Sequence, residues 1–280
     1  MVQLAAMTKT QAGESTHLAS DIVKEVRREG VSVVPGVFSP SECRKFTDVL
    51  DRVVRELVNS KAYYGSSSTQ VVYNYFFYDD ALYDLFAHPL IDSVMSALID
   101  PDYVLISPSA RNPYINKDLP GGGQTSGSGW HVDSRVANPE TGDLFRPSLS
   151  YYAAIALEPF ERDNSATNYV PRSHLLYKKP QDRNANLDFE ILEAKAGSML
   201  FFDSALWHRT GIPTDRSRWS IFNMYGPWHM KPYFRFAENF SRDKIQSLPV
   251  HVQKLLHLCS VPPKHANGRT TTVTKTPTHD

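Results

Sequence analysis

The segment GWHVDS (residues 129–134) carries an imidazole and a carboxylate two residues apart, at His131 and Asp133. In extended backbone, side chains alternate between faces, so both groups point to the same side. A second imidazole, His208, follows a short apolar run later in the chain. Two neutral imidazoles and one carboxylate form the facial triad of non-haem Fe(II) sites, which leaves metal positions open for other ligands. Each histidine alone is better explained as an ordinary polar residue at a sheet edge, so the prediction depends on the whole set.

A cation lies further along the chain, where Arg218 opens the run RWSIFN. Alternation along a strand puts Arg218, Ser220 and Phe222 on one face, with a small hydroxyl beside the guanidinium. Arginine pairs bidentately with a carboxylate and keeps its charge when buried, which suits one end of a dicarboxylate. Arg216 has the same parity one pleat away, so it stays open as the alternative anchor.

These pieces occur in an order that resembles the phytanoyl-CoA dioxygenase family of Fe(II)- and 2-oxoglutarate-dependent oxygenases. The motifs are HVD at 131–133, PRSH at 171–174, GSMLFFD at 197–203, the distal His208 and RWSI at 218–221. The family's usual Pro-Gly-Ser-His and Asn-Gly turns are replaced by PRSH and Asn164-Ser165, which concerns loops and not the metal ligands. The resemblance implies a double-stranded β-helix (jelly-roll, cupin-like) core, iron held by His131, Asp133 and His208, and the 2-oxoglutarate C5 carboxylate held by Arg218.

The activity that this resemblance implies is oxidative. Fe(II), 2-oxoglutarate and O2 would together hydroxylate an unactivated C–H bond of a small molecule, or oxidise it by desaturation, epoxidation or ring formation. The cofactor would carry the difficult chemistry, and the protein would aim the bond and exclude water. We therefore expect a dioxygenase of secondary metabolism whose substrate the sequence does not identify.

Three other functions fit parts of the pattern. A halogenase would lack the carboxylate ligand, so Asp133 argues against one. A jelly-roll module that binds a small molecule or a sugar without redox chemistry would have no use for Arg218. A zinc hydrolase needs a general base beside its metal, and the sequence contains no HExxH motif.

Further candidates surround the expected site. We predict that Ser220, Tyr114 and Asn116 lie beside 2-oxoglutarate, and that Tyr75, Trp130 and Arg135 contact the substrate. Tyr75 belongs to an aromatic run, Tyr73 to Phe77, for which core packing is the competing interpretation.

The elements that must position these residues are mostly short strands. β-Branched and aromatic runs bounded by Gly, Pro or Asn predict strands at residues 31–34, 71–77, 103–107, 149–157, 167–170, 198–202 and 218–225. Because the strands from residue 71 onward follow one another without helices between them, they favour an antiparallel sandwich or barrel over a parallel α/β sheet. The fold class is mainly β with flanking helices.

Three helices are predicted ahead of most of these strands. An apolar stripe from Leu18 to Val26, ended by Gly30, indicates a short surface helix. The sequence SPSE at 39–42 is a capping box, and the helix after it buries Cys43 among apolar side chains. Residues 90–99 form the third helix.

Composition limits the domain organisation. The 280 residues are 41% hydrophobic and 21% charged, which is typical of a packed globular chain. We predict one oxygenase domain over residues 16–262, with a helical part at 16–100, a jelly-roll core at about 71–230 and a C-terminal cap at 231–262. A flexible lead (1–15) and a disordered tail (263–280) flank it.

Charge and cysteine content limit the partners. Thirty Lys and Arg balance thirty Asp and Glu, so neither nucleic acid nor a membrane surface is an expected partner. No apolar run is long enough for a membrane span, and no signal peptide is evident. With only Cys43 and Cys259, a reducing, cytoplasmic location is favoured. The expected partner is a small-molecule substrate, and a homodimer is the open alternative to a monomer.

Overall fold

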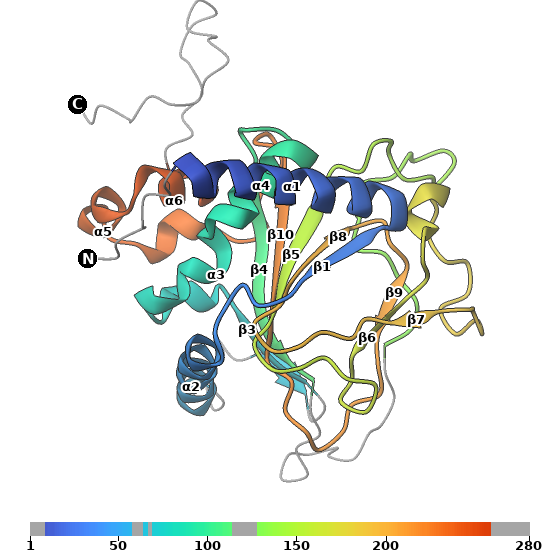
Figure 1. Ribbon diagram of the computed structural model, residues 1–280, viewed down its shortest axis with the longest axis horizontal. Helices are drawn as coiled ribbons and strands as arrows, with labels where there is room; N and C mark the ends of the chain where they lie inside the picture. The colour runs from blue at the N-terminus through green and yellow to red at the C-terminus, as the bar shows by residue number, and fades with distance from the viewer. Residues whose placement is uncertain (1–8, 58–63, 67–68, 114–127, 259–280) are drawn as a thin grey trace, which may run out of the picture.

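Two antiparallel sheets make up the centre of the molecule (Figure 1). The computed structural model describes residues 9–57, 64–66, 69–113 and 128–258. The larger sheet has seven strands in the order β1-β8-β5-β10-β4-β3-β2, and the smaller has three in the order β7-β6-β9. The strands are β1 (Val31–Val34), β2 (Tyr64–Ser66), β3 (Thr69–Tyr73), β4 (Val104–Asn112), β5 (Tyr151–Ala156), β6 (Thr167–Tyr169), β7 (Glu190–Ile191), β8 (Met199–Asp203), β9 (His208–Thr210) and β10 (Ser220–Gly226).

Helices cover one face of the larger sheet (Figure 1). They are α1 (Lys9–Glu29), α2 (Pro40–Leu57), α3 (Asp84–Ala87), α4 (Pro89–Leu98), α5 (Arg242–Ser247) and α6 (Val250–Leu255). On this face Ile155, Phe201 and Ile221 pack into one apolar cluster with the helices. Residues of the opposite parity on these strands point to the other face. Among them, Tyr152 and Phe202 pack in a second cluster with residues of the smaller sheet. The fold class predicted from the sequence, antiparallel β with flanking helices, is confirmed.

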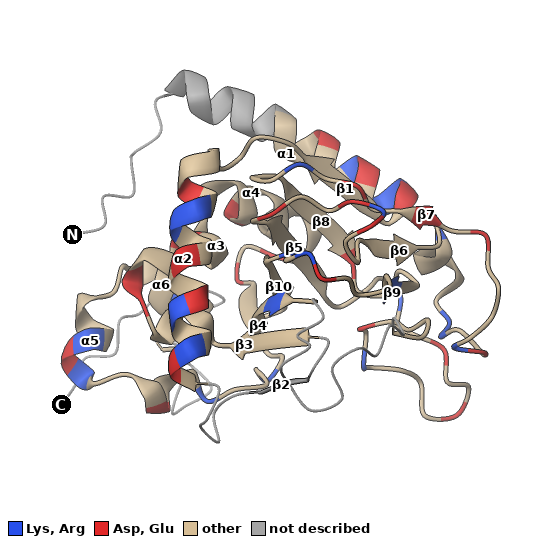
Figure 2. Cartoon of the chain, turned by 90° about the horizontal axis from the view of Figure 1, so that it is seen from below, with Lys and Arg blue, Asp and Glu red and all other residues tan. Residues whose placement is uncertain are grey.

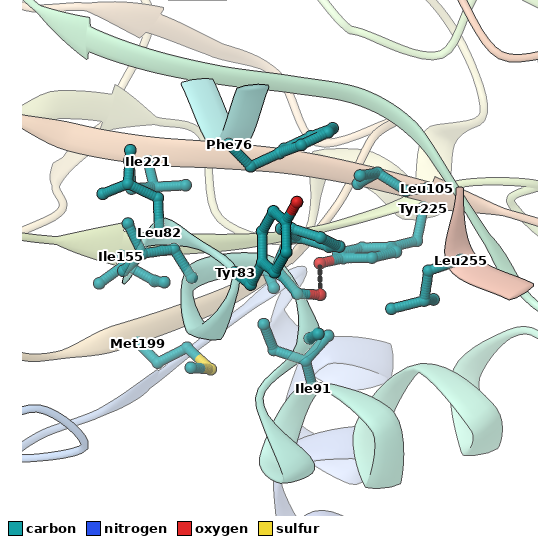
Figure 3. Close-up of a cluster of buried hydrophobic side chains, with 14 of the residues drawn as sticks. Phe76, Leu82, Tyr83, Ile91, Leu105, Ile155, Met199, Ile221, Tyr225 and Leu255 are labelled. Carbon is teal, nitrogen blue, oxygen red and sulfur yellow. Dashed lines mark hydrogen bonds between the residues drawn. The ribbon is translucent and has the colours of Figure 1, made fainter. Parts of the chain in front are cut away.

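The helix-covered core also contains polar groups, and those of Tyr225, Tyr75 and Asn223 are hydrogen-bonded. The Tyr225 hydroxyl donates to the Phe86 carbonyl at 2.7 Å, and Figure 3 shows this bond among the surrounding apolar side chains. Asn223 accepts from the Tyr75 hydroxyl at 2.9 Å and donates to the Leu85 carbonyl at 2.7 Å. Because an unpaired buried polar group costs about 1–3 kcal/mol, these bonds fix where α3 lies against β10.

The capping box predicted before α2 is present. The Ser39 amide donates to the Glu42 carboxylate at 2.7 Å, and the Glu42 amide donates back to the Ser39 hydroxyl at 3.3 Å. Cys43, Phe46 and Leu50 form the buried stripe of this helix. Figure 2 shows its charged residues gathered in alternating bands of opposite sign, while the central strands are almost free of charge.

Several element boundaries differ from the sequence-based prediction. Helix α1 begins at Lys9, inside the segment expected to be a flexible lead, and residues 1–8 lie outside the described residues. Strand β3 ends at Tyr73 because Asn74 has a left-handed backbone (φ 52°) and a 3-10 turn follows. Strand β4 continues through Pro108 to Asn112, five residues beyond its expected end.

The C-terminal segment forms short helices where a cap was predicted, with α6 packed near α3 and β4. The tail predicted to be disordered lies outside the described residues. None of the described helices is long and apolar enough to cross a bilayer.

Gly197 provides a test of the packing between β8 and the segment before α2. Its φ is +83°, and an added Cβ would lie 2.0 Å from the Phe38 carbonyl oxygen. The Phe38 amide donates to the Gly197 carbonyl, which holds the two backbones close together. We expect Gly197→Ala to lower the free energy of unfolding by about 3 kcal/mol or more, because backbone strain adds to the clash.

Gly36→Ala is the matched control, since φ there is +71° with open space around the Cβ. The free energy of unfolding of Gly36→Ala should fall by about 1–2 kcal/mol, from backbone strain alone. Urea unfolding measures both, and equal losses would contradict the steric explanation.

Candidate metal centre

His131 and His208 are brought together by their own backbones. The His131 amide donates to the His208 carbonyl and the His208 amide donates to the His131 carbonyl, both at 3.0 Å. The Asp133 amide donates to the carbonyl of Ser204, in the turn between β8 and β9, at 2.9 Å. The HxD segment is therefore bonded to the start of β9 and to the turn that leads into it from β8, which sets the three side chains against one another.

Hydrogen bonds at Nδ1 fix the orientation of both imidazoles. Nδ1 of His131 lies 2.8 Å from the Gly129 carbonyl, and Nδ1 of His208 lies 2.8 Å from the Leu206 carbonyl. A carbonyl can only accept, so each neutral ring carries its proton on Nδ1 and presents the lone pair of Nε2. Metal-binding histidines are oriented in this way.

The ligand atoms of His131, Asp133 and His208 all lie within 4.8 Å of one another. Among the residues that the structure describes, this is the one such group of three metal-binding side chains. The sequence-based expectation that these side chains converge is thus confirmed, and their spacing is small enough for one ion to contact all three.

The three groups also adjust one another's protonation. Although burial raises the pKa of Asp133, its contact with His208 at 3.4 Å holds that pKa well below its ordinary value. Burial and the neighbouring His208 lower the pKa of His131, which keeps its imidazole neutral. Burial also lowers the pKa of His208, but the Asp133 carboxylate outweighs it and raises the pKa overall. A divalent metal requires the ionised carboxylate and neutral imidazoles, so it would displace the proton that Asp133 stabilises on His208.

Arg218 is buried and lines the cleft that contains these ligands, and the exposed Arg111 lines the same cleft. Its amide donates to the Asn112 side chain at 2.8 Å, and its guanidinium lies 4.2 Å from the centroid of the Phe160 ring. Among the residues that the structure describes, its Nε and Nη1 have no hydrogen-bond partner. Burial lowers the pKa of Arg218 to about 9, so the group is still charged at neutral pH. An unpaired buried cation is costly, which makes this position suited to an anionic ligand.

Arg216, the alternative anchor, lies on the surface. Its guanidinium contacts the carboxylates of Glu161 at 2.5 Å and Asp163 at 2.8 Å, and its side chain is 48% exposed. The geometry therefore favours Arg218 over Arg216 as the carboxylate anchor.

The other residues predicted to contact 2-oxoglutarate or the substrate differ in burial and in distance from the metal ligands. Ser220 is buried and donates to the Arg111 carbonyl at 3.0 Å, so its hydroxyl is occupied within the sheet. Trp130 is buried beside His131, with its indole N–H bonded to the Ala185 carbonyl at 2.9 Å. Arg135 is exposed, with its guanidinium carbon 4.8 Å from the centroid of the Tyr233 ring. Tyr114 and Asn116 lie outside the described residues.

Tyr75 requires a correction. The sequence analysis placed it at the substrate, whereas the structure places it in the helix-covered core, fully buried and bonded to Asn223. The left-handed residue Asn74 ends the strand before it, so the alternation of β3 does not extend to Tyr75.

Sequence reasoning missed several residues of the cleft. These are Arg111, Tyr152, Thr167, Thr210 and Phe222. Phe222 was assigned the correct face but no role. Arg111 was missed because β4 was predicted to stop at Ser107, before Pro108. Continuing the alternation from Ser107 through Ser109 would have reached it.

Fe(II) and 2-oxoglutarate fit the residues present. Two imidazole nitrogens and one carboxylate suit a divalent iron, and the unpaired nitrogens of Arg218 suit a carboxylate. The fold and this cleft define a class: jelly-roll proteins with a two-histidine, one-carboxylate centre and a buried arginine. The family model of phytanoyl-CoA dioxygenase (PhyH) matches residues 26–219. The chain belongs to this family.

Curated relatives match part of the chain, and solved structures share its fold. The uncharacterized protein Rv1501 of Mycobacterium tuberculosis is 30% identical over 119 residues, covering 41% of this chain and 44% of that protein. The dioxygenase af480 of Aspergillus fumigatus is 27% identical over 104 residues, 36% of this chain and 33% of that protein. The chain thus matches less than half the length of these relatives. The epimerase SnoN, solved with Fe3+, alpha ketoglutarate and nogalamycin RO, superposes with a TM-score of 0.59 at 18% identity, over 77% of this chain and 87% of that chain. At that identity the likeness shows the jelly-roll fold.

Proposed function

We propose that this protein is an Fe(II)- and 2-oxoglutarate-dependent dioxygenase that oxidises an unactivated C–H bond of a small molecule, with hydroxylation as the expected outcome. The observation that carries the proposal is the unpaired, buried guanidinium of Arg218 in the same cleft as His131, Asp133 and His208. A metal-binding module without redox chemistry has no need of such a cation. Family membership supports the same activity.

Each residue has a role that follows from its surroundings. Nε2 of His131 and of His208 would hold the iron, with Nδ1 of each ring anchored to a backbone carbonyl. Asp133 would supply a negative charge that offsets part of the metal's charge. Arg218 would bind the C5 carboxylate of 2-oxoglutarate, with Phe160 packed against the guanidinium.

The bound iron and cosubstrate would supply the oxidising chemistry, in which 2-oxoglutarate is decarboxylated to succinate and CO2 while O2 is consumed. The chain's own contribution is to hold these partners on one side of the cleft and to orient the substrate on the other. A place in secondary metabolism is part of the proposal, since SnoN is an enzyme of nogalamycin biosynthesis. The presence of Asp133 argues for oxygen transfer and against halogenation.

The proposal is tested by 2-oxoglutarate turnover. We expect the purified protein to form succinate slowly when given Fe(II), O2 and 2-oxoglutarate, and to stop when the iron is chelated. Replacing His208 with alanine should remove this turnover, whereas Arg216→Ala, on the surface, should retain it. Tight metal binding without any succinate formation would instead favour the jelly-roll binding module.

A further inference from the structure

Arg111 is a second cation in the cleft. It lies on β4 opposite Ser220 of β10, and it lines the same cleft as Asp133 and Arg218. Asp133 is the single carboxylate among the described lining residues of that cleft. The cleft therefore holds more positive than negative side chains before any metal enters it.

Nε of Arg111 is hydrogen-bonded, whereas its two terminal nitrogens are available to a ligand. Its Nε donates to the Ser109 hydroxyl at 3.1 Å, and its guanidinium carbon lies 5.6 Å from the centroid of the Phe222 ring. Within the described part of the chain, its two terminal nitrogens have no hydrogen-bond partner, and no carboxylate lies within 4.0 Å. The side chain is exposed, so an incoming ligand can reach it.

The proposed binding of 2-oxoglutarate does not use this cation. One carboxylate of 2-oxoglutarate pairs with Arg218 and the other chelates the metal, while Asp133 is a metal ligand. Arg111 is close enough to Asp133 to lower the pKa of that carboxyl, but in this arrangement Asp133 is engaged by the metal. The exposed guanidinium then faces the cleft, where its planar fork suits a bidentate acid.

We propose that Arg111 binds an acidic group of the substrate, so that this enzyme acts on a small molecule that carries a carboxylate or a phosphate. This inference rests on the function proposed above and adds the substrate class to it. Two arginines in one cleft also disfavour a polycationic substrate, because like charges in a desolvated site repel.

Arg135 extends the positive surface outside the cleft. It follows Asp133 by two residues, is exposed, and stacks on Tyr233. Among the described residues it has no carboxylate within 4.0 Å. Burial raises the pKa of Tyr233, with Arg135 lowering it and Asp133 raising it, which places Arg135 and Asp133 near the same phenol. Arg135 is thus a third arginine near Asp133, in addition to Arg111 and Arg218.

The test uses three probes that differ only in the head group: phenylbutyrate, phenylbutyl phosphate and phenylbutanol. Each is titrated by calorimetry into the Ni(II)-loaded protein saturated with 2-oxoglutarate. We expect one acid to bind at least about tenfold more tightly than the alcohol, with the advantage falling as salt is added. The tighter of the two acids identifies the head group.

Arg111→Gln should remove the preference for the acid, and Arg216→Gln, whose arginine is paired on the surface, should retain it. Thermal unfolding checks that both variants are folded. An equal affinity for acid and alcohol, or an acid preference that survives Arg111→Gln, would overturn the inference.

A preceding titration with 2-oxoglutarate alone separates this inference from the proposed function. Arg111→Gln should change 2-oxoglutarate affinity less than twofold, because Arg218 holds the distal carboxylate. If Arg111→Gln weakened 2-oxoglutarate as much as Arg218→Ala, Arg111 would belong to the cosubstrate site and the inference would fail. If Arg218→Ala left 2-oxoglutarate binding unchanged, the proposed function would fail instead.

Discussion

Asp133→Ala is expected to abolish product formation and to weaken Fe(II) binding by more than about a hundredfold, since losing even an outer-sphere partner of a metal ligand costs about 10–100-fold. The carboxylate lies 3.4 Å from Nε2 of His208 and is held in its ionised form, so its removal takes away both a proposed metal ligand and the one negative charge among the described lining residues of the cleft. Metal affinity is measured by equilibrium dialysis, and product formation by succinate release and product mass.

The control for Asp133→Ala is Asp163→Ala, which removes an exposed carboxylate that pairs with Arg216. That variant should keep full activity. Adding chloride separates oxygen transfer from halogenation, and chloride should not restore the Asp133→Ala variant. A chlorinated product from the unmodified protein, or full activity of Asp133→Ala, would refute the assignment.

Arg218→Ala is expected to weaken 2-oxoglutarate binding by about 3–5 kcal/mol, the usual cost of leaving one member of a buried ion pair without its partner. The guanidinium is buried with two nitrogens unpaired among the described residues, so its removal would leave the distal carboxylate of 2-oxoglutarate without the cation proposed to bind it. Calorimetric titration of 2-oxoglutarate into the Ni(II)-loaded protein measures the effect. Metal affinity in the absence of 2-oxoglutarate should stay close to that of the unmodified protein.

The free energy of unfolding, measured with and without 2-oxoglutarate, is a second test of Arg218→Ala. Removing this buried charge should change the free energy of unfolding without ligand only slightly, because the desolvation cost of the guanidinium offsets its attraction to Glu158 and its contact with Phe160. Stabilisation by added 2-oxoglutarate should then be lost, because a ligand stabilises the native state only to the extent that it binds it. Arg216→Ala is the matched control and should bind 2-oxoglutarate normally. If Arg216→Ala lost 2-oxoglutarate binding and Arg218→Ala kept it, Arg216 would be the residue that binds the distal carboxylate.

The cleft distinguishes this chain from a generic member of its fold. Jelly-roll proteins that share an architecture differ in what they bind, because specificity depends on the side chains that line the site. Here these include two arginines and one aspartate. The expected effects of Asp133 and Arg218 concern the metal and the cosubstrate, whereas Arg111 concerns the substrate.

Local sequence patterns predicted most of the elements because they depend on near neighbours. The capping box at Ser39 and the apolar stripe behind it fix α2, and the run 31–34 coincides with β1. Period-two alternation correctly put Phe222 on the cleft side of its strand and Ile221 on the helix side. The same local reasoning failed at Asn74, where one left-handed residue ends the strand.

The sequence by itself determined which residue types could form the site: two histidines, an aspartate and an arginine in a characteristic order. Tertiary structure decided how they meet, because His131 pairs with His208 through backbone bonds between segments far apart in the chain. It also buried Arg218 and left Arg216 in surface ion pairs, although both have the same strand parity. Arg111 joined the site only when β4 paired with β10. Alternation specifies the face on which a side chain lies, but only the pairing of distant strands specifies which side chains share that face.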